Sequence, residues 1–159
     1  MAEILFYHLT ETRLEETLPS LLEKSLERGW RACIHCGSDE AIDALDAQLW
    51  TYRNDSFLAH GKDDMGKGDM GKDGVDNAQF QPILLTKDDT AKNNAEVRFV
   101  VEMGPEPDVA TCERIVYMFD GHNQSQLVRA RSQWKAFSSG GIEKTYWQQT
   151  PERRWVKKA

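Results

Sequence analysis

Short apolar runs alternate with amphipathic segments over the first fifty residues, and this alternation limits the possible folds more than any other feature. Residues 3–9 (EILFYHL) and 30–36 (WRACIHC) are typical of buried strands. Between them, leucines recur at helical spacing, at Leu14, Leu18, Leu21, Leu22 and Leu26. Ser38 is a good N-cap for a second helix, which carries Ile42, Leu45 and Leu49 on one face. The order β-α-β-α predicts a parallel sheet covered by helices.

The later chain continues this pattern. Three more strands are predicted, at Pro82–Thr86, Val97–Glu102 and Arg114–Phe119. A helix over Asn123–Phe137 and a short strand near residues 144–147 follow. We therefore expect one three-layer α/β domain over residues 1–150, with a mostly parallel, Rossmann-like sheet, and a basic C-terminal tail at 151–159.

Two features of the first helix concern how it begins. Thr12 and Glu15 have the spacing of a capping box, in which each side chain bonds a backbone N–H of the other residue. Pro19 lies inside the leucine pattern. The regular helix therefore either starts near Pro19 or is kinked there.

The chain has the length and composition of a single globular domain. Its 159 residues contain no apolar run of the roughly 18 residues that a membrane span needs. The N-terminus MAEILFYHL lacks the basic start and cleavage site of a signal peptide. Three cysteines, an odd number, suit a reducing compartment. We expect a cytoplasmic protein.

Residues 61–79, GKDDMGKGDMGKDGVDNAQ, form the one low-complexity segment, and we expect it to be a mobile loop. It contains two near-matches to the phosphate-binding motif GxxxxGK[ST]. Gly68 and Asp73 stand where that motif needs Ser or Thr to hold magnesium. The aspartates of the segment also lack the spacing of an EF-hand calcium loop. The loop therefore predicts neither a nucleotide site nor a calcium site.

The usual signs of catalysis are missing as well. The loop after the first strand, Thr10–Thr12, has no glycine, so the sheet lacks the dinucleotide-binding fingerprint. Cys33 and Cys36 match C-x-x-C, but they fall in a predicted strand and are expected to be core residues. No two histidines have metal-ligand spacing, and G-x-S-x-G is absent. We predict no catalytic site, no cofactor and no metal.

Charge is distributed unevenly along the chain. The net charge is −6, yet residues 121–159 hold eight Lys/Arg against two Glu. In the helix Asn123–Phe137, an apolar stripe includes Trp134, and Arg131 and Lys135 flank it one turn apart. Arg129 lies nearly opposite. Two cations beside an aromatic could hold a carboxylate above an apolar side chain. The alternative is a core tryptophan with solvated neighbours.

Four stretches of the sequence resemble the chi subunit family of the bacterial DNA polymerase III holoenzyme. They are ILFYHL, GWRACIHC, DxxLWTYxxxSFLxHG, and the closing RxxWKxF followed by YWQQ, which together span most of the chain in the family's order. The resemblance implies a non-catalytic α/β subunit of the clamp-loader assembly. Such proteins bind the acidic C-terminal tail of single-stranded DNA-binding protein, and this tail ends in a phenylalanine. Their usual partner is the psi subunit, which many bacterial lineages lack in recognisable form.

The resemblance also suggests site residues. Arg131 matches the carboxylate-binding arginine of the family, Trp134 its adjacent aromatic residue, and Lys135 the neighbouring cation. Trp50 and Phe57 match aromatics of the signature loop, which we expect to lie near the pocket. A second interpretation is direct nucleic-acid binding through the basic C-terminal quarter, although the acidic remainder of the chain opposes it.

Overall fold

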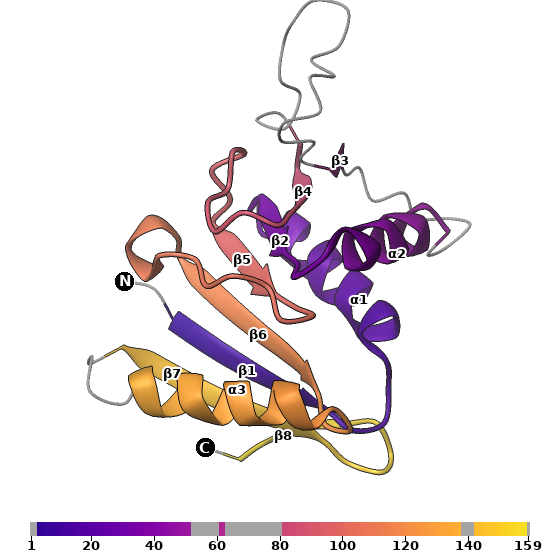
Figure 1. Cartoon of the computed structure of the whole chain (residues 1–159), viewed down its shortest axis with the longest axis vertical. Helices are drawn as coiled ribbons and strands as arrows, with labels where there is room; N and C mark the ends of the chain where they lie inside the picture. Colours follow the sequence, from indigo (N-terminus) through magenta and orange to yellow (C-terminus); the bar gives the residue numbers. More distant parts are fainter. Residues whose placement is uncertain (1–2, 52–60, 63–80, 138–141, 159) are drawn as a thin grey trace, which may run out of the picture.

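A mostly parallel sheet organises the computed structural model, which describes residues 3–51, 61–62, 81–137 and 142–158 (Figure 1). Within this part of the chain, eight strands lie in the order β3-β4-β2-β5-β6-β1-β7-β8. All pairs are parallel except β7 with β8. The strands are β1 (Glu3–Leu9), β2 (Ala32–His35), β3 (Gly61–Lys62), β4 (Ile83–Thr86), β5 (Val97–Val100), β6 (Arg114–Asp120), β7 (Glu143–Gln149) and β8 (Trp155–Lys157).

Helices cover both faces of the sheet. They are α1 (Leu14–Glu27), α2 (Asp39–Trp50) and α3 (Gln124–Ala136), with a short 3-10 turn, η2 (Val109–Thr111). The helices α1 and α2 pack on one face, and α3 packs on the other, in front of β1 and β7 in Figure 1. The three-layer α/β fold predicted from the sequence is confirmed.

The two helical layers follow from the direction in which the chain crosses the sheet. From β1 through α1 to β2 it moves toward the β3 edge, and from β6 through α3 to β7 it moves toward the β8 edge. Because such crossovers are right-handed, opposite directions place their helices on opposite faces. The chain therefore changes direction between the adjacent strands β1 and β6, which is where open α/β sheets usually bind ligands.

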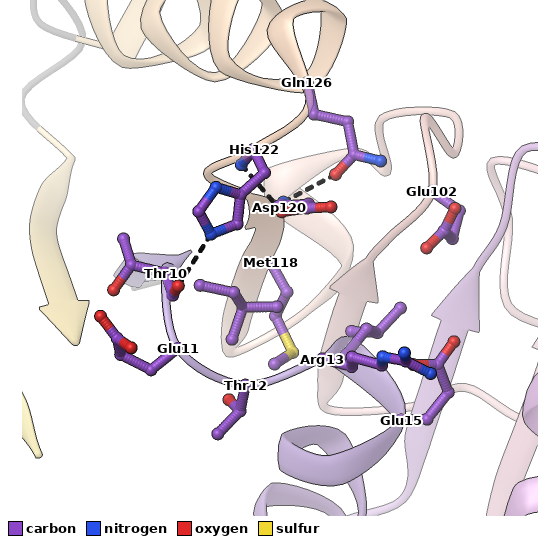
Figure 2. A pocket seen from close by; sticks show the side chains of 12 residues that line it. Thr10, Glu11, Thr12, Arg13, Glu15, Glu102, Met118, Asp120, His122 and Gln126 are labelled. Carbon is purple, nitrogen blue, oxygen red and sulfur yellow. Dashed lines mark hydrogen bonds between the residues drawn. The ribbon is translucent and has the colours of Figure 1, made fainter. Parts of the chain in front are cut away.

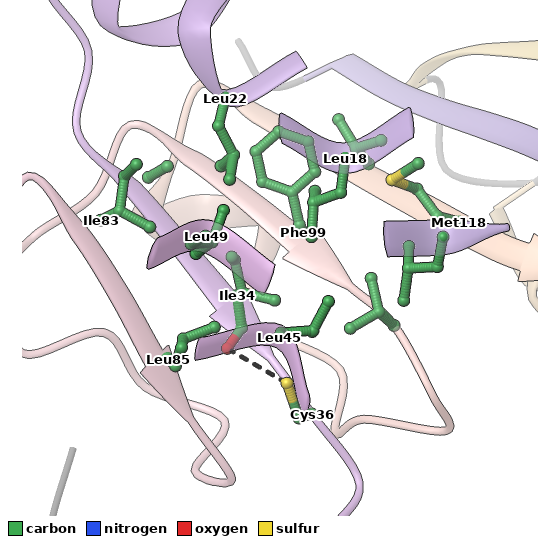
Figure 3. Close-up of a cluster of buried hydrophobic side chains, with 14 of the residues drawn as sticks. Leu18, Leu22, Ile34, Cys36, Leu45, Leu49, Ile83, Leu85, Phe99 and Met118 are labelled. Atoms are coloured by element: carbon green, nitrogen blue, oxygen red, sulfur yellow. Dashed lines mark hydrogen bonds between the residues drawn. The ribbon is translucent and has the colours of Figure 1, made fainter. Parts of the chain in front are cut away.

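Alternate residues of the strands supply two large cores and a small third cluster, made of Cys33, Leu84 and Ala95. The larger lies under α1 and α2 and includes Leu18, Leu22, Ile34, Leu49 and Phe99 (Figure 3). Each fully buried side chain of this size contributes about 1.5–3 kcal/mol. The second core lies under α3 and is rich in aromatic rings; its buried members are Ile4, Phe6, Val100, Ile115, Tyr117, Phe119 and Ala130.

Two helices begin as the sequence predicts. The Ser38 hydroxyl accepts a hydrogen bond from the Ala41 N–H at 3.1 Å, and the Asn123 side chain accepts one from the Gln126 N–H at 3.1 Å. Each bond satisfies a backbone donor that the first helical turn leaves unpaired.

The capping box predicted at Thr12 is wrong. Arg13 is the N-cap residue of α1 and makes no side-chain capping bond. The Thr12 hydroxyl instead accepts from the Gln149 side-chain amide at 2.8 Å and lies 2.7 Å from the Thr17 hydroxyl. A tertiary contact has therefore replaced the local cap. The helix begins at Leu14, so Pro19 lies inside it.

Cys33 and Cys36 are core residues, as predicted. Both are fully buried, and they belong to clusters on opposite faces of the sheet. Burial raises the pKa of the Cys36 thiol to about 12. A thiol that stays protonated in this way is a poor nucleophile or metal ligand.

Other expectations fall partly outside the described residues. Of the low-complexity segment 61–79, only Gly61 and Lys62 are described, and they form the edge strand β3. The sequence does not predict this strand, nor β8, which lies within the basic segment 151–159. No helix in the described ranges combines the length and apolar character needed to cross a membrane.

The buried side chain of His35 should make folding sensitive to pH. Its Nδ1 lies 2.7 Å from the Asp88 carbonyl, and its buried Nε2 meets no hydrogen-bond partner among the described residues. Burial lowers the pKa of His35 below 6.5. The unfolded chain therefore binds the proton more readily than the folded chain. The free energy of unfolding should be highest above pH 6.5, the ordinary pKa of histidine, and should decline as the pH falls below it.

We therefore expect the free energy of unfolding to be lower at about pH 5.5 than at about pH 7.5. Urea titrations at both values would measure this difference. The substitution His35→Asn keeps a donor for the Asp88 carbonyl but cannot titrate, so it should reduce the pH dependence of the free energy of unfolding. His122→Asn, at an exposed position, is the control and should leave that pH dependence in place. Equal pH dependence in the two variants would contradict this role for His35.

Candidate functional site

The helix α3 is the element on which the sequence places the binding residues. Its first turn is tied to the sheet by Gln126, whose side-chain oxygen accepts from the Asp120 N–H at 2.8 Å. Gln126, Ala130 and Gln133 are buried against the strands, while Leu127, Trp134 and Phe137 pack at the edge of the second core. The predicted apolar stripe of this helix is confirmed.

Trp134 lies at the boundary between core and solvent. Its ring contacts Phe6 edge-on at 5.3 Å between centroids and Tyr146 edge-on at 5.7 Å. The Lys144 ammonium lies 4.0 Å from the ring centroid and donates to the Trp134 carbonyl at 2.8 Å. Trp134 is half-buried, so it serves the core and also presents part of its surface to solvent.

Arg131 and Lys135 are exposed beside this tryptophan. The charge of Arg131 acts on two groups of the neighbouring strands, His8 of β1 and Tyr146 of β7. Burial, and secondly the Arg131 charge, lower the pKa of His8. Burial raises the pKa of Tyr146, and Arg131 partly opposes that shift. The guanidinium is therefore close enough to His8 and Tyr146 to act on both electrostatically.

Tyr146 lies between His8 and Trp134 and contacts both rings. The Tyr146 hydroxyl lies 2.8 Å from His8 Nδ1, and their rings meet edge-on at 6.0 Å. We call the five residues His8, Arg131, Trp134, Lys135 and Tyr146 the α3 patch. Sequence reasoning missed His8 and Tyr146 because their proximity depends on the pairing of β1 with β7. The YWQQ stretch was the available signal.

The structure does not bring Trp50 to this patch. Trp50 ends α2, which packs on the opposite face of the sheet, near β3 and β4, and its side chain is 57% exposed. The patch lies instead near β1 and β7, several strands away. Phe57, the other aromatic assigned to the signature loop, is outside the described residues.

A cavity of about 370 Å³ opens at the carboxyl ends of β1 and β6, where the chain changes direction (Figure 2). Four carboxylates line it, from the loop after β1, the first turn of α1, the turn after β5 and the end of β6; they are Glu11, Glu15, Glu102 and Asp120. Burial, with Glu15 and Asp120 nearby, raises the pKa of Glu102. The His122 ring bridges two of the loops through a 2.9 Å contact with the Thr10 carbonyl.

The loop that binds phosphate in related folds is occupied by a side chain of the protein itself. The side-chain oxygen of Gln149 accepts hydrogen bonds from three consecutive backbone N–H groups, those of Thr10, Glu11 and Thr12, at 3.1, 3.0 and 3.2 Å. These donors would otherwise be available to an anion. With carboxylates lining the same cavity, the arrangement disfavours nucleotide binding.

Across the described part of the chain, no three or more His, Cys, Asp or Glu side chains are grouped so as to hold an ion. The α3 patch has the chemistry for recognising an anion. An exposed guanidinium can form a forked contact with a carboxylate, and the aromatic rings beside it can receive an apolar side chain.

One family model covers most of the chain. The family model described as "DNA polymerase III chi subunit, HolC" matches residues 1–145. This range includes α3 with Arg131, Trp134 and Lys135, and it ends just before Tyr146 and Gln149. No curated protein matches the chain.

Proposed function

Because the chain belongs to the DNA polymerase III chi subunit family and so has an accessory role in replication with that complex, we propose that it is a non-catalytic adaptor. In this proposal it binds the acidic C-terminal tail of single-stranded DNA-binding protein and links that protein to the clamp loader. Clamp-loader subunits, with a psi subunit where the organism has one, are its other partners, and it works in the cytoplasm.

The observation that carries this proposal is the pairing of an exposed Arg131 with half-buried aromatic rings in the α3 patch. An acidic tail with a terminal phenylalanine offers carboxylates and an aromatic side chain close together. Arg131 can donate two parallel hydrogen bonds to a carboxylate, and Lys135 adds a point charge one turn along the helix. Trp134 and Tyr146 provide an aromatic surface for the phenylalanine.

An anion bound to Arg131 should change the titration of His8. Burial, and secondly the Arg131 charge, lower the pKa of His8. A carboxylate bound to Arg131 would offset its charge, so the pKa of His8 should rise when the tail binds. By linkage, the tail should then bind more tightly as the pH falls toward this pKa, as long as its own carboxylates remain ionised.

A second candidate is direct binding of single-stranded nucleic acid. It is favoured by four exposed cations in and around β8, namely Arg153, Arg154, Lys157 and Lys158. Trp155 lies among them and contacts Tyr7 edge-on at 4.9 Å. Cations near an aromatic ring can follow a phosphate backbone and stack a base.

Removing the tail from the partner separates these functions. We expect the protein to co-elute in size-exclusion chromatography with intact single-stranded DNA-binding protein of its own organism. It should not co-elute with the same protein lacking its acidic tail, since the α3 patch would have no ligand. The tail-less partner should still bind DNA, which controls for its folding. Co-elution that survives loss of the tail, or that requires DNA, would contradict the adaptor proposal.

A further inference from the structure

A second groove, of about 390 Å³, lies between the C-terminal half of α1 and the amino ends of the central strands. Its floor is apolar, formed by Leu5, Val97, Phe99 and Val116, with the Tyr7 ring beside them. These residues face the α1 side of the sheet, so the groove and the α3 patch are on opposite faces. Its volume is within the roughly 300–1,000 Å³ of ordinary ligand pockets.

Three cations line this groove, namely Lys24, Arg28 and Arg114. The guanidinium carbons of Arg28 and Arg114 lie 4.1 and 5.2 Å from the centroid of the same ring, that of Trp30. Like charges this close to one ring repel each other, and an anion bound beside them would relieve that repulsion. Contact with the Trp30 ring restrains both guanidinium groups.

The neighbouring carboxylates only partly neutralise these charges. Glu3 forms an ion pair with Arg114, and Glu27 also lines the groove. Lys24 and Arg28 are exposed on the last turns of α1. A cluster of positive charge therefore borders an apolar floor on a protein whose net charge is −6.

We propose that this groove binds an acidic peptide segment of a partner protein that carries a bulky apolar side chain. The carboxylates contact Arg28, Lys24 and Arg114, and the apolar side chain rests on Leu5, Tyr7 and Leu21, which are only partly buried. A peptide fits better than nucleic acid because the cations gather at one place and do not form a track. The site is independent of tail binding at the α3 patch.

The test uses the full chain with Arg131→Ala, which disables the α3 patch. The probe is a short fluorescein-labelled peptide of Asp and Gly with one central Phe. Companion probes replace that Phe by Gly, replace every Asp by Asn, or are single-stranded oligothymidine. Arg28→Glu is compared with Arg154→Glu, because both positions are exposed and both substitutions change the charge equally. Arg154 lies in the turn between β7 and β8, at the other end of the sheet.

We expect the acidic Phe peptide to bind, with Arg28→Glu weakening it about tenfold or more and Arg154→Glu changing it little. Both altered peptides should bind weakly. In nitrogen-edited NMR spectra, the indole N–H signal of Trp30 should shift on binding. Equal affinities for the two charge-reversal variants, or an unmoved Trp30 signal, would overturn the proposal. Tighter binding of oligothymidine that depends on Arg28 would also overturn it.

Discussion

Replacing Gln149 by leucine is expected to lower the free energy of unfolding by roughly 2–4 kcal/mol. The side-chain oxygen of Gln149 accepts from three backbone N–H groups, and its amide nitrogen donates to the Thr12 hydroxyl. Gln149 is only 6% exposed. Leucine has a similar volume but offers no acceptor, so the three N–H groups would lose the partner that holds them together.

Urea unfolding followed by circular dichroism measures this cost. Gln148→Leu is the matched control. It is the same substitution on the preceding residue of β7, whose side chain points to the other face of the sheet. Gln148→Leu should change stability much less than Gln149→Leu. Equal losses would show that Gln149 does not hold the loop between β1 and α1 in the way described.

The second large effect concerns the α3 patch. Arg131→Ala should weaken binding of the acidic tail by roughly 1.5–3 kcal/mol, because a bidentate contact beside partly buried rings is lost. Lys135→Ala should cost less, since an ammonium offers a point charge without a fork. Fluorescence anisotropy with a labelled tail peptide measures both values.

Arg129 provides the internal control. It lies on the other side of α3, and its guanidinium donates to the Gly104 carbonyl. Arg129→Ala should therefore reduce the stability of the protein while leaving the affinity of the folded protein for the tail almost unchanged. Direct nucleic-acid binding predicts a different result, in which each lost cation weakens binding by a similar amount. Equal weakening by Arg129→Ala and Arg131→Ala, with both variants folded, would rule out the α3 patch as the tail site.

The sequence predicted those elements whose signals are local. Apolar runs and helical spacing identified six of the eight described strands and all three helices within a few residues, and Ser38 was a recognisable cap. The capping box predicted at Thr12 does not form, because the Thr12 hydroxyl bonds the Gln149 side chain, 137 positions away in the sequence. The local signals also missed β3 and β8, which are short edge strands with little apolar character.

The residues of the candidate site also separate into those with a local sequence signal and those that depend on strand pairing. Helical periodicity predicted the apolar stripe of α3 that includes Trp134, and Arg131 and Lys135 are exposed on the same helix. Periodicity could not place His8 and Tyr146 in the α3 patch, because only the pairing of β1 with β7 brings them together. Nor could it assign a face of the sheet to Trp50. That assignment requires the strand order and the crossover directions, which no single segment encodes.

The central claim is that the α3 patch recognises a carboxylate together with a phenylalanine. Its most direct test is an anisotropy titration of the full chain with a labelled acidic tail peptide, intact or lacking the terminal phenylalanine. The account predicts that the intact peptide binds, that loss of the phenylalanine abolishes most of the affinity, and that Arg131→Ala removes the difference between the two peptides. Equal binding of both peptides to the unaltered protein would leave only general charge attraction and would contradict the account.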